Sequence, residues 1–275
     1  ERWMQLFPNF KALAAAPIEK VLKAWEGLGY YSRARNLHKL AQAVTSQHGG
    51  QLPADITELQ KLPGIGPYSS RSIASLAYGT PAACVDGNVV RVLSRLMLID
   101  KPFKSSAAAQ QQFQPIADRV LNHAHPGMHN EAMMEFGATI CTKHNPRCTI
   151  CPMNHMCQAF LAGRQEELPR FDSKKIESKL VKRVWVSHQG RVLLHQGKAA
   201  TGHLHGLWEL PTPEALGIKR LPKKELLRRV RNITKYKITE VIYKVSKTDE
   251  LLPRLKKIPH LRWANVEEMK ELPLS

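Results

Sequence analysis

The stretch "ACVDGNVVRVLSRL", residues 83–96, decides how this sequence folds and which chemistry it can offer. A single acidic residue, Asp86, separates an apolar run from an amphipathic helix. The nearest other acidic residues are Glu58 upstream and Asp100 downstream. Asp86 is therefore either the cap of that helix or a group that takes part in chemistry. Asn88 is the better N-cap for the helix, so we expect the Asp86 carboxylate to point elsewhere.

Helical spacing of apolar residues extends on both sides of this stretch. The segments with this spacing cover residues 17–31, 34–49, 55–62, 68–79, 88–98, 107–124 and 129–141. Asp55 is expected to cap the helix that follows it, because Glu58 stands three residues later. Residues 1–163 are therefore predicted to form a mainly α N-terminal domain.

The pattern changes in the second part of the chain. Residues 164–180 are polar with no strong period and are interpreted as a linker. Residues 182–196 predict two strands around a Gln-Gly turn, and residues 237–246 alternate apolar with polar side chains. Residues 222–233 are interpreted as a basic helix. Residues 181–275 are therefore predicted to form a smaller α+β domain.

The chain is strongly basic, with 41 Lys and Arg against 23 Asp and Glu and a net charge of +18 over 275 residues. Such a balance indicates a polyanionic partner, most often nucleic acid. An anionic lipid surface or simple solubility would also suit the charge, but the motifs below favour nucleic acid. No apolar run approaches the length of a bilayer span, so no membrane partner is expected.

Four of the five cysteines stand close together, with six, two and five residues between them. They are Cys141, Cys148, Cys151 and Cys157. Thiolates so close in sequence can converge on one metal centre, and four of them suit either zinc or an iron–sulfur cluster. Disulfides are disfavoured, because a chain with no secretion signal usually keeps its thiols reduced. Cys84 is interpreted as a small core residue.

The stretch "KLPGIGPYSS", residues 61–70, lies between two predicted helices. Gly64 and Gly66 allow a tight turn with positive φ and close backbone approach. The next helix, with Ser69 in its first turn, offers free N–H groups and the positive end of its dipole. Together these features predict a cradle for a phosphate. A plain helix–helix turn is the alternative, but the basic chain and Asp86, twenty residues on, favour the cradle.

Read in order, these motifs resemble the endonuclease III, or helix–hairpin–helix, superfamily of DNA glycosylases over residues 1–163. The matching stretches are "GLGYYSRARNL" at 27–37, "LPGIGPYSSRSIASLAYG" at 62–79, "VDGN" at 85–88, "NEAMMEFGATIC" at 130–141 and then the four cysteines. The resemblance implies a helix–hairpin–helix glycosylase fold. It also implies one 4Fe–4S cluster in loop 141–157, because the uneven cysteine spacing is similar to the cluster loop of that superfamily.

Tyr68 distinguishes between branches of the superfamily. Endonuclease III-type enzymes carry at this position a lysine that forms a Schiff base with the sugar, and a phenol cannot form an imine. Tyr68 and "VDGN" are instead similar to the adenine DNA glycosylases of the MutY type. These are monofunctional base excision repair enzymes that excise adenine mispaired with 8-oxoguanine. The stretch "HGLWELP", residues 205–211, resembles their Nudix-like C-terminal domain, so residues 181–275 are expected to recognise the lesion.

The resemblance also assigns roles to particular residues. Cleaving an N-glycosidic bond leaves positive charge on the sugar, and a fixed carboxylate stabilises that charge. Asp86 is expected to face the sugar, with Tyr68 and Asn88 beside it, while the adenine is flipped out and protonated. Leu28 and Tyr30 would enter the DNA stack as a wedge; a buried turn is the alternative for both.

The lesion-reading residues are expected in the C-terminal domain. In the resembling family a Phe-Ser-His stretch reads 8-oxoguanine, and the matching position here is Ile233-Thr234-Lys235. Thr234 keeps the hydroxyl, Lys235 replaces the histidine, and Tyr236 is the candidate aromatic residue. The sequence has no Arg-Glu-x-x-Glu-Glu run of a Nudix hydrolase, so nucleotide hydrolysis is not expected.

The acid of the resembling family is a glutamate in a helix that precedes the segment matching residue 1. The chain begins at Glu1 without an initiator methionine, and neither Glu1 nor Glu26 stands in the matching motif. We therefore expect a chain that is truncated at its N-terminus and severely impaired as a glycosylase. Two alternatives stay open: an endonuclease III-like glycosylase and lyase, and a non-catalytic DNA-binding remnant.

Remaining expectations concern the surroundings of the site and of the protein. Glu131 is interpreted as a charge at the start of a helix, with a neighbour of the site as the alternative, and Arg33 and Arg35 as phosphate contacts or a solvated face. The expected partner is double-stranded DNA with an adenine mispair. The protein is expected to act as a monomer in the bacterial cytoplasm, on nucleoid DNA.

Overall fold

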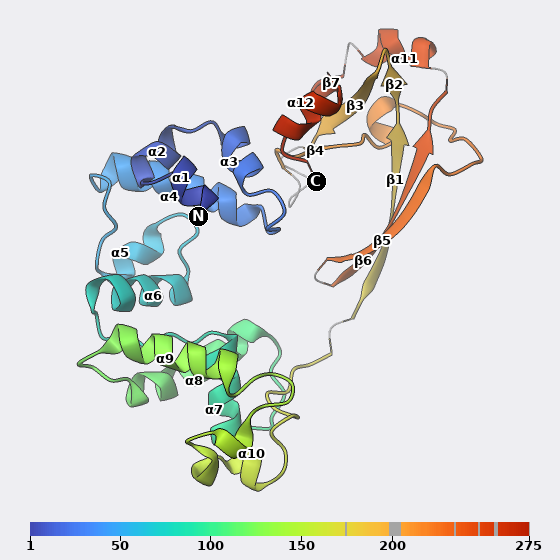
Figure 1. Cartoon of the computed structure of the whole chain (residues 1–275). Coiled ribbons are helices and arrows are strands. Elements are labelled where there is room, and N and C mark those ends of the chain that lie inside the picture. Colours follow the sequence, from blue (N-terminus) through green and yellow to red (C-terminus); the bar gives the residue numbers. More distant parts are fainter. Residues whose placement is uncertain (174, 198–204, 234, 247, 256–257, 275) are drawn as a thin grey trace. The chain divides into compact units, whose positions relative to one another are not determined.

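Short helices follow one another from Arg2 to Leu161, as the hydrophobic spacing predicts (Figure 1). The computed structural model describes residues 1–173, 175–197, 205–233, 235–246, 248–255 and 258–274. Contacts group the chain into two compact units, Gln51–Ser173 on one hand and Glu1–Gly50 together with Lys174–Ser275 on the other. The predicted domains 1–163 and 181–275 do not coincide with these units, and that division stays a prediction.

The unit Gln51–Ser173 is built around one buried helix, α7. Its helices are α5 (Ile56–Lys61), α6 (Pro67–Tyr78), α7 (Gly87–Leu96), α8 (Ser106–Val120), α9 (Pro126–Thr139) and α10 (Gln158–Leu161), with 3-10 turns η1 (Cys148–Ile150) and η2 (Asn154–Met156). Val89, Val90 and Leu93 of α7 pack with Phe103 and Phe113 in one cluster of buried side chains. The burial of α7 fixes where its polar residues lie.

A buried polar network holds the chain just before α7. Asn130 of α9 is almost fully buried. Its side-chain amide donates to Ser75 Oγ (2.9 Å) and to the Ala82 carbonyl (2.9 Å), and its Oδ1 accepts from the Cys84 N–H (2.9 Å). Each polar group of Asn130 is thus satisfied inside the core, as burial requires. Cys84 is buried, which confirms its predicted role in the core.

The segment predicted as a linker, residues 164–180, is ordered at both ends. Arg164 forms ion pairs with Glu167 (2.9 Å) and Asp100 (3.3 Å). Leu168 is buried, and Phe171 forms an isolated β-bridge with Phe103. At the other end, β1 begins at Glu177. The polar composition of this segment therefore gave no sign of the buried Leu168 or of the start of strand β1.

The other unit contains all of the strands found in the described residues, together with helices in both its N-terminal and its C-terminal part. The helices of its N-terminal part are α1 (Arg2–Leu6), α2 (Phe10–Ala15), α3 (Ile18–Ala24) and α4 (Ser32–Gln47). Their buried side chains include Leu13, Val21 and Leu22, and Leu207 from the distant C-terminal part joins this cluster. The helices thus share a hydrophobic core with the segment before β4.

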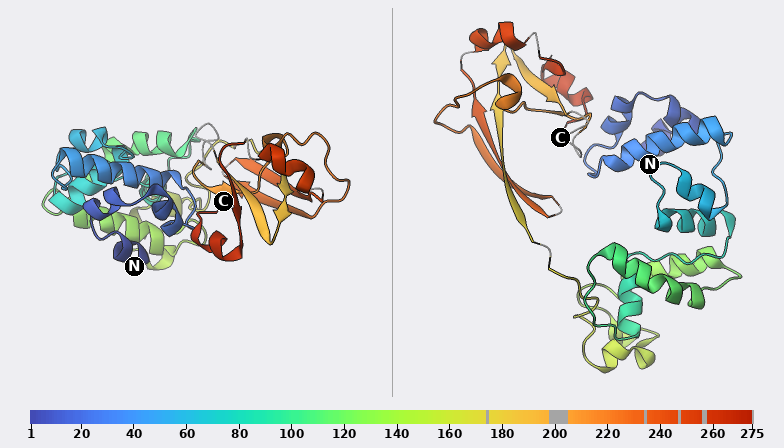
Figure 2. Two further views of the ribbon diagram at one scale, coloured as in Figure 1. Left: turned by 90° about the horizontal axis from the view of Figure 1, so that it is seen from above. Right: turned by 180° about the vertical axis from the view of Figure 1, so that it is seen from behind.

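Two sheets form the C-terminal part (Figures 1 and 2). One has the order β1-β6-β5, and in the other β3 pairs with β2, β4 and β7. The elements are β1 (Glu177–Trp185), β2 (Ser187–His188), β3 (Arg191–Gln196), β4 (Trp208–Glu209), η4 (Glu214–Leu216), β5 (Leu227–Ile233), β6 (Tyr236–Lys244), α11 (Thr248–Leu255), β7 (Leu261–Ala264) and α12 (Val266–Glu271). The predicted α+β composition of this part is confirmed.

Two of the three local predictions for this part are confirmed, and one is wrong. Gln189 and Gly190 both have positive φ, as a two-residue hairpin turn requires, and residues 237–246 lie largely in β6. Residues 222–233 were predicted as a helix, but Leu227–Ile233 forms β5, antiparallel to β6. Cross-strand pairing and the β-branched Val230 and Ile233 outweigh the helix propensity of the basic residues.

A buried ion network joins the two sheets. Arg183 of β1 pairs with Glu209 of β4 at 2.5 Å and with Glu240 of β6 at 3.3 Å, and Arg229 of β5 also pairs with Glu240. Burial alone would raise the pKa of Glu240, but the hydrogen bond and charge of Arg229 outweigh it, so this pKa is lowered. The carboxylate stays ionised at neutral pH and can compensate the buried guanidinium.

None of the helices in the described part of the chain has both the length and the apolar character of a membrane span.

The contact between α7 and α9 leaves no room for a side chain at Gly137. A Cβ atom there would lie 2.6 Å from Asn88 Cβ. We predict that Gly137→Ala destabilises the protein by about 1–3 kcal/mol, the usual effect of overpacking. Urea unfolding followed by circular dichroism measures this change.

The matched control is Gly87→Ala, at the start of the same helix α7. A Cβ atom at Gly87 would meet nothing within 4 Å, and its φ is not positive. We expect a change of less than about 1 kcal/mol, since alanine is the better helix former. Equal destabilisation by both substitutions would contradict the steric argument.

Candidate active site and cysteine-lined cavity

The predicted hairpin lies between α5 and α6. Gly64 has φ of +79°, as predicted, whereas Gly66 has φ of −97° and forms the N-cap of α6. The expectation of positive φ at Gly66 is therefore wrong. Ile65 is buried and anchors the turn. No side chain caps α6, so N–H groups of its first turn, including those of Tyr68 and Ser69, stay available to an anion.

Asp86 is the N-cap of α7, which corrects the expectation that Asn88 has this role. Its Oδ1 accepts the Val89 N–H at 2.8 Å, and its Oδ2 accepts from Asn88 Nδ2 at 3.0 Å. The extended backbone of Asp86 (φ −97°, ψ −172°) places the carboxylate over the first turn of the helix. A carboxylate accepts about four hydrogen bonds, so capping leaves acceptor capacity on both oxygens.

The Asp86 carboxylate also lines an open pocket. Asn88 lines it beside Asp86, and the opposite wall comes from one face of α9: Met128, Glu131, Ala132, Met134, Glu135 and Ala138. Glu131 is in the middle of α9 and lines the pocket, so its interpretation as a helix-start charge is wrong and the alternative, a neighbour of the site, agrees with the structure. Glu135 was missed, although its spacing from Met128 and Glu131 on one helical face could have revealed it.

Tyr68 lies at the edge of this pocket. Its hydroxyl donates to Met134 Sδ at 3.2 Å, and Met134 lines the pocket. Burial and then the negative charge of Asp86 raise the pKa of Tyr68 above its ordinary value. The phenol therefore stays protonated at neutral pH and can act as a hydrogen-bond donor. The structure thus brings together Asp86, Asn88 and Tyr68, the three predicted catalytic residues.

Hydrogen bonds link this pocket to the first cysteine of the quartet. Arg91 Nη2 donates to Asn88 Oδ1 (2.9 Å) and to the Gly137 carbonyl (2.6 Å). Its Nε donates to the Cys141 carbonyl at 2.7 Å. The guanidinium fork thereby fixes Asn88, the partner of Asp86, against the end of α9.

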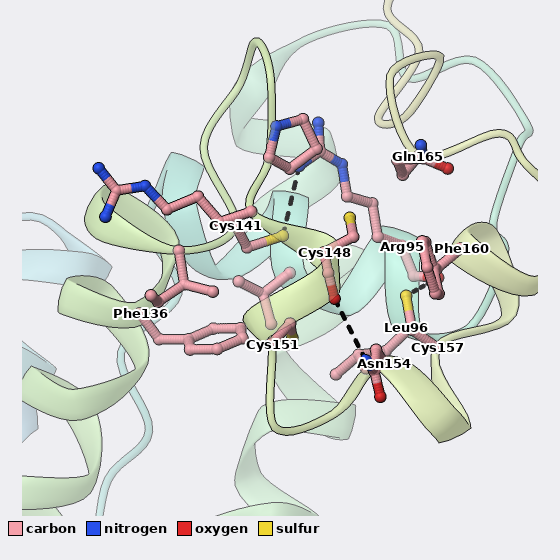
Figure 3. Close-up of a pocket in the computed structure, with 14 residues that line it drawn as sticks. Arg95, Leu96, Phe136, Cys141, Cys148, Cys151, Asn154, Cys157, Phe160 and Gln165 are labelled. Carbon is pink, nitrogen blue, oxygen red and sulfur yellow. Dashed lines mark hydrogen bonds between the residues drawn. The ribbon is translucent and has the colours of Figure 1, made fainter.

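The four cysteines of the quartet line one cavity (Figure 3). Tight turns bring them together: the Cys151 N–H donates to the Cys148 carbonyl (3.2 Å), and the Cys157 N–H donates to the Asn154 carbonyl (3.3 Å). All four thiols are free of disulfides. Burial, followed by the negative charges of Cys141 and Cys157, raises the pKa of Cys148. Four thiolates here therefore need a positively charged centre.

Four free thiols offer the donors that a four-iron cluster needs. Within the described ranges, no group of three or more His, Cys, Asp or Glu side chains is placed to hold a single metal ion. A four-iron cluster takes one thiolate at each corner, so its ligands surround a body and do not meet at a point. Four free cysteines around one cavity match that requirement.

Leu28 and Tyr30 lie on an exposed loop of the other unit. Their side chains are 66% and 65% exposed, so the alternative of a buried turn is wrong. Gly27 and Gly29 have positive φ, and Tyr30 itself has φ of +46°. The Trp25 indole N–H donates to the Gly29 carbonyl at 2.9 Å and holds the loop. Both side chains are thus presented to solvent on a tightly bent backbone.

The lesion-reading candidates lie at the turn between β5 and β6, where Ile233 pairs with Tyr236. Thr234 lies outside the described residues. Lys235 pairs with Glu177 at 2.6 Å, and the Lys179 ammonium is 3.5 Å from the centre of the Tyr236 ring. The turn therefore combines positive charge with an aromatic face.

Comparisons with known proteins agree with the motifs. Residues 1–117 match the HhH-GPD superfamily base excision DNA repair protein family. The chain is 43% identical to the adenine DNA glycosylase of Homo sapiens over 167 residues, covering 60% of this chain and 30% of that protein. It is 37% identical to the adenine DNA glycosylase of Mycolicibacterium smegmatis over 163 residues, covering 58% and 54%. These similarities confirm the resemblance to adenine DNA glycosylases.

A solved structure supports the fold. A non-covalent endonuclease III–DNA complex matches with a TM-score of 0.52 and 27% identity, covering 59% of this chain and 74% of that chain. The chain spans between about a third and a half of the length of these two curated relatives, 30% and 54% respectively.

The capping role of Asp86 can be separated from its role in the pocket. We predict that Asp86→Ala lowers the free energy of unfolding by about 0.5–2 kcal/mol, because the cap of α7 is lost. Asp86→Asn keeps a side-chain acceptor for the Val89 N–H. We expect it to lower the free energy of unfolding by only a few tenths of a kcal/mol. Thermal unfolding of the two variants beside the unmodified protein checks this order, and equal losses would refute it.

Proposed function

We propose that this protein hydrolyses the N-glycosidic bond of adenine in DNA, because residues 1–117 match the HhH-GPD superfamily of base excision DNA repair proteins. The adenine is mispaired with 8-oxoguanine or guanine. The observation that carries the proposal is the Asp86 carboxylate, which lines an open pocket beside Asn88.

Asp86 stabilises the positive charge that develops on the sugar as the bond to adenine breaks. Its oxygens are already held by the Val89 N–H and by Asn88, so the carboxylate needs little reorganisation during the reaction. Such preorganised charge is a large part of enzymatic rate enhancement. The pocket is open enough for a nucleotide that has left the base stack.

Polar groups around Asp86 complete the site. The protonated Tyr68 hydroxyl can donate to the substrate, and no lysine stands in its place, so hydrolysis without lyase chemistry is favoured. Glu131 lines the same pocket and offers an acceptor for the amino group of adenine.

Double-stranded DNA is the proposed partner. The Gly64 turn and the uncapped start of α6 hold a backbone phosphate, and the exposed Leu28 and Tyr30 enter the stack near the lesion. The net charge of +18 supports binding to the polyanion. The protein acts as a monomer in the bacterial cytoplasm.

Cys141, Cys148, Cys151 and Cys157 would hold one 4Fe–4S cluster. With all four positions taken by cysteine, the cluster would order the loop near the DNA backbone, while the chemistry on the base belongs to the Asp86 pocket. Zinc is the alternative centre. Iron analysis and the brown absorbance of the anaerobically purified protein decide between the two.

The C-terminal sheets form a Nudix-like domain that reads 8-oxoguanine where β5 meets β6, beside Lys235 and Tyr236. Lys235 and Tyr236 supply charge and an aromatic face, so recognition depends more on charge than in relatives with a histidine.

We predict that Asp86→Asn lowers adenine release at least about a hundredfold, as loss of a transition-state stabilising group does. The assay measures single-turnover release from a duplex with adenine opposite 8-oxoguanine. It uses the product of the whole open reading frame, and unfolding curves confirm that the variant is folded. An undiminished rate in Asp86→Asn would refute the assignment.

The same assay discriminates the alternatives. Borohydride trapping of a covalent DNA adduct would indicate a lyase. Tight binding without release by the whole protein would indicate a non-catalytic remnant.

Lesion reading generates a separate prediction. With a non-cleavable adenine analogue, the protein is expected to bind a duplex with 8-oxoguanine at least about tenfold more tightly than one with guanine, a difference of about 1.4 kcal/mol. Tyr236→Ala should reduce this ratio, whereas Tyr243→Ala on the same strand, away from the turn, serves as the control. Equal affinities of the unmodified protein for the two duplexes would refute lesion reading.

A further inference from the structure

Arg95 is a buried cation at the cysteine-lined cavity. Only 1% of its surface is exposed, although it is on α7, the helix capped by Asp86. Its Nη1 donates to Cys141 Sγ (3.3 Å) and to the Thr142 carbonyl (2.7 Å), and its Nη2 donates to the Lys143 carbonyl (3.1 Å). Its Nε donates to the Leu168 carbonyl at 3.1 Å. Figure 3 shows the contact with Cys141.

The partners of this guanidinium leave its charge uncompensated. Within the described ranges they are three carbonyl oxygens and one sulfur, and none is a carboxylate. Arg183, the other buried arginine, is by contrast paired with Glu209 and Glu240. A buried charge without a counterion is costly. An anion is therefore required beside Arg95, and the cavity that it lines contains four cysteines.

Arg95 also touches the cysteine segment at both ends. Its guanidinium binds the run from Cys141 to Lys143, where the segment begins, and Leu168 beyond its end. Its own carbonyl oxygen lies 3.5 Å from Cys157 Sγ, the last cysteine of the quartet. Arg95, a single residue of the buried helix α7, thus contacts both Cys141 and Cys157, the first and the last cysteine of the quartet.

We infer that Arg95 is the internal counter-cation and positioning residue of the anionic centre held by the four cysteines. Its charge offsets that of the thiolates and raises the reduction potential of the centre, because a nearby cation stabilises the more negative, reduced state. Its hydrogen bonds close the loop around the centre. This inference rests on the proposed iron–sulfur cluster and is independent of the proposed action on adenine.

The planar guanidinium explains why arginine is suited to this position. A fork of five N–H donors reaches several acceptors at once, whereas an ammonium is a compact point charge. Arg95→Lys therefore keeps the charge and loses most of the hydrogen bonds, while Arg95→Gln removes the charge. Comparing the two variants separates electrostatic compensation from positioning.

Arg147 provides the matched control. It lines the same cavity as Arg95, but its side chain is exposed to solvent. Water and salt screen an exposed charge far more than a buried one. Arg147→Gln is therefore expected to change the reduction potential and the retention of iron much less than Arg95→Gln.

The test uses the product of the whole open reading frame, purified without oxygen and studied without DNA. It measures iron per protein, the rate at which a chelator removes iron, and the reduction potential by protein-film voltammetry. Arg95→Gln is expected to have a more negative potential and to lose iron about 10–100 times faster, as variants of groups that support a metal centre do. Arg95→Lys should keep the potential near that of the unmodified protein and still lose iron faster.

The outcomes distinguish failure of the proposed role of Arg95 from failure of the proposed iron–sulfur cluster on which it rests. Absence of iron from the unmodified protein would refute the proposed cluster. An iron-loaded Arg95→Gln with unchanged potential and release rate would overturn the role of Arg95, as would an equal shift in Arg147→Gln. If Arg95→Gln fails to load and Arg95→Lys loads, the counter-cation role is supported. If neither Arg95→Gln nor Arg95→Lys takes up iron while Arg147→Gln does, the proposed compensation of charge by Arg95 is overturned.

Discussion

The close contact between α7 and α9 is the constraint on which the rest of the Gln51–Ser173 unit depends. Gly137 allows α9 to lie directly against Asn88, with no room for even a methyl group. That approach puts the acidic face of α9 opposite Asp86 and brings Cys141, just past the end of α9, within reach of Arg91 and Arg95. The pocket and the cysteine-lined cavity are therefore two ends of one helix–helix packing arrangement.

The helix α7 can support both the pocket and the cysteine-lined cavity because its two ends carry opposite partial charges. The N-terminus of α7 carries partial positive charge, so it binds the Asp86 carboxylate without an added cation. Farther along, Arg95 is in the last turn of α7, where a cation is favoured, and it meets the sulfur of Cys141. Hydrogen-bond donors of the helix thus meet the Asp86 carboxylate at one end and the Cys141 sulfur at the other.

Local signals in the sequence predicted much of this arrangement, and tertiary packing decided the rest. Periodicity located the helices, and cysteine spacing located the cavity, because both depend on residues close in the chain. Residues 227–233, within the helix predicted at 222–233, form a strand because they pair with β6, and this cross-strand pairing is not visible in the local sequence pattern. Glu135 and Arg95 were not identified as site residues, since their positions depend on the packing of α7 against α9.

The capping role of Asp86 refines the assignment made from sequence without weakening it. An aspartate that only capped a helix would need no second partner and no pocket, yet Asn88 binds its other oxygen and Arg91 in turn binds Asn88. These bonds fix the rotation of the carboxylate, whereas capping alone would fix one oxygen. A carboxylate that must face a short-lived positive charge benefits from being fixed at both oxygens. Capping and the proposed catalytic role therefore use the same orientation, and one aspartate can satisfy both.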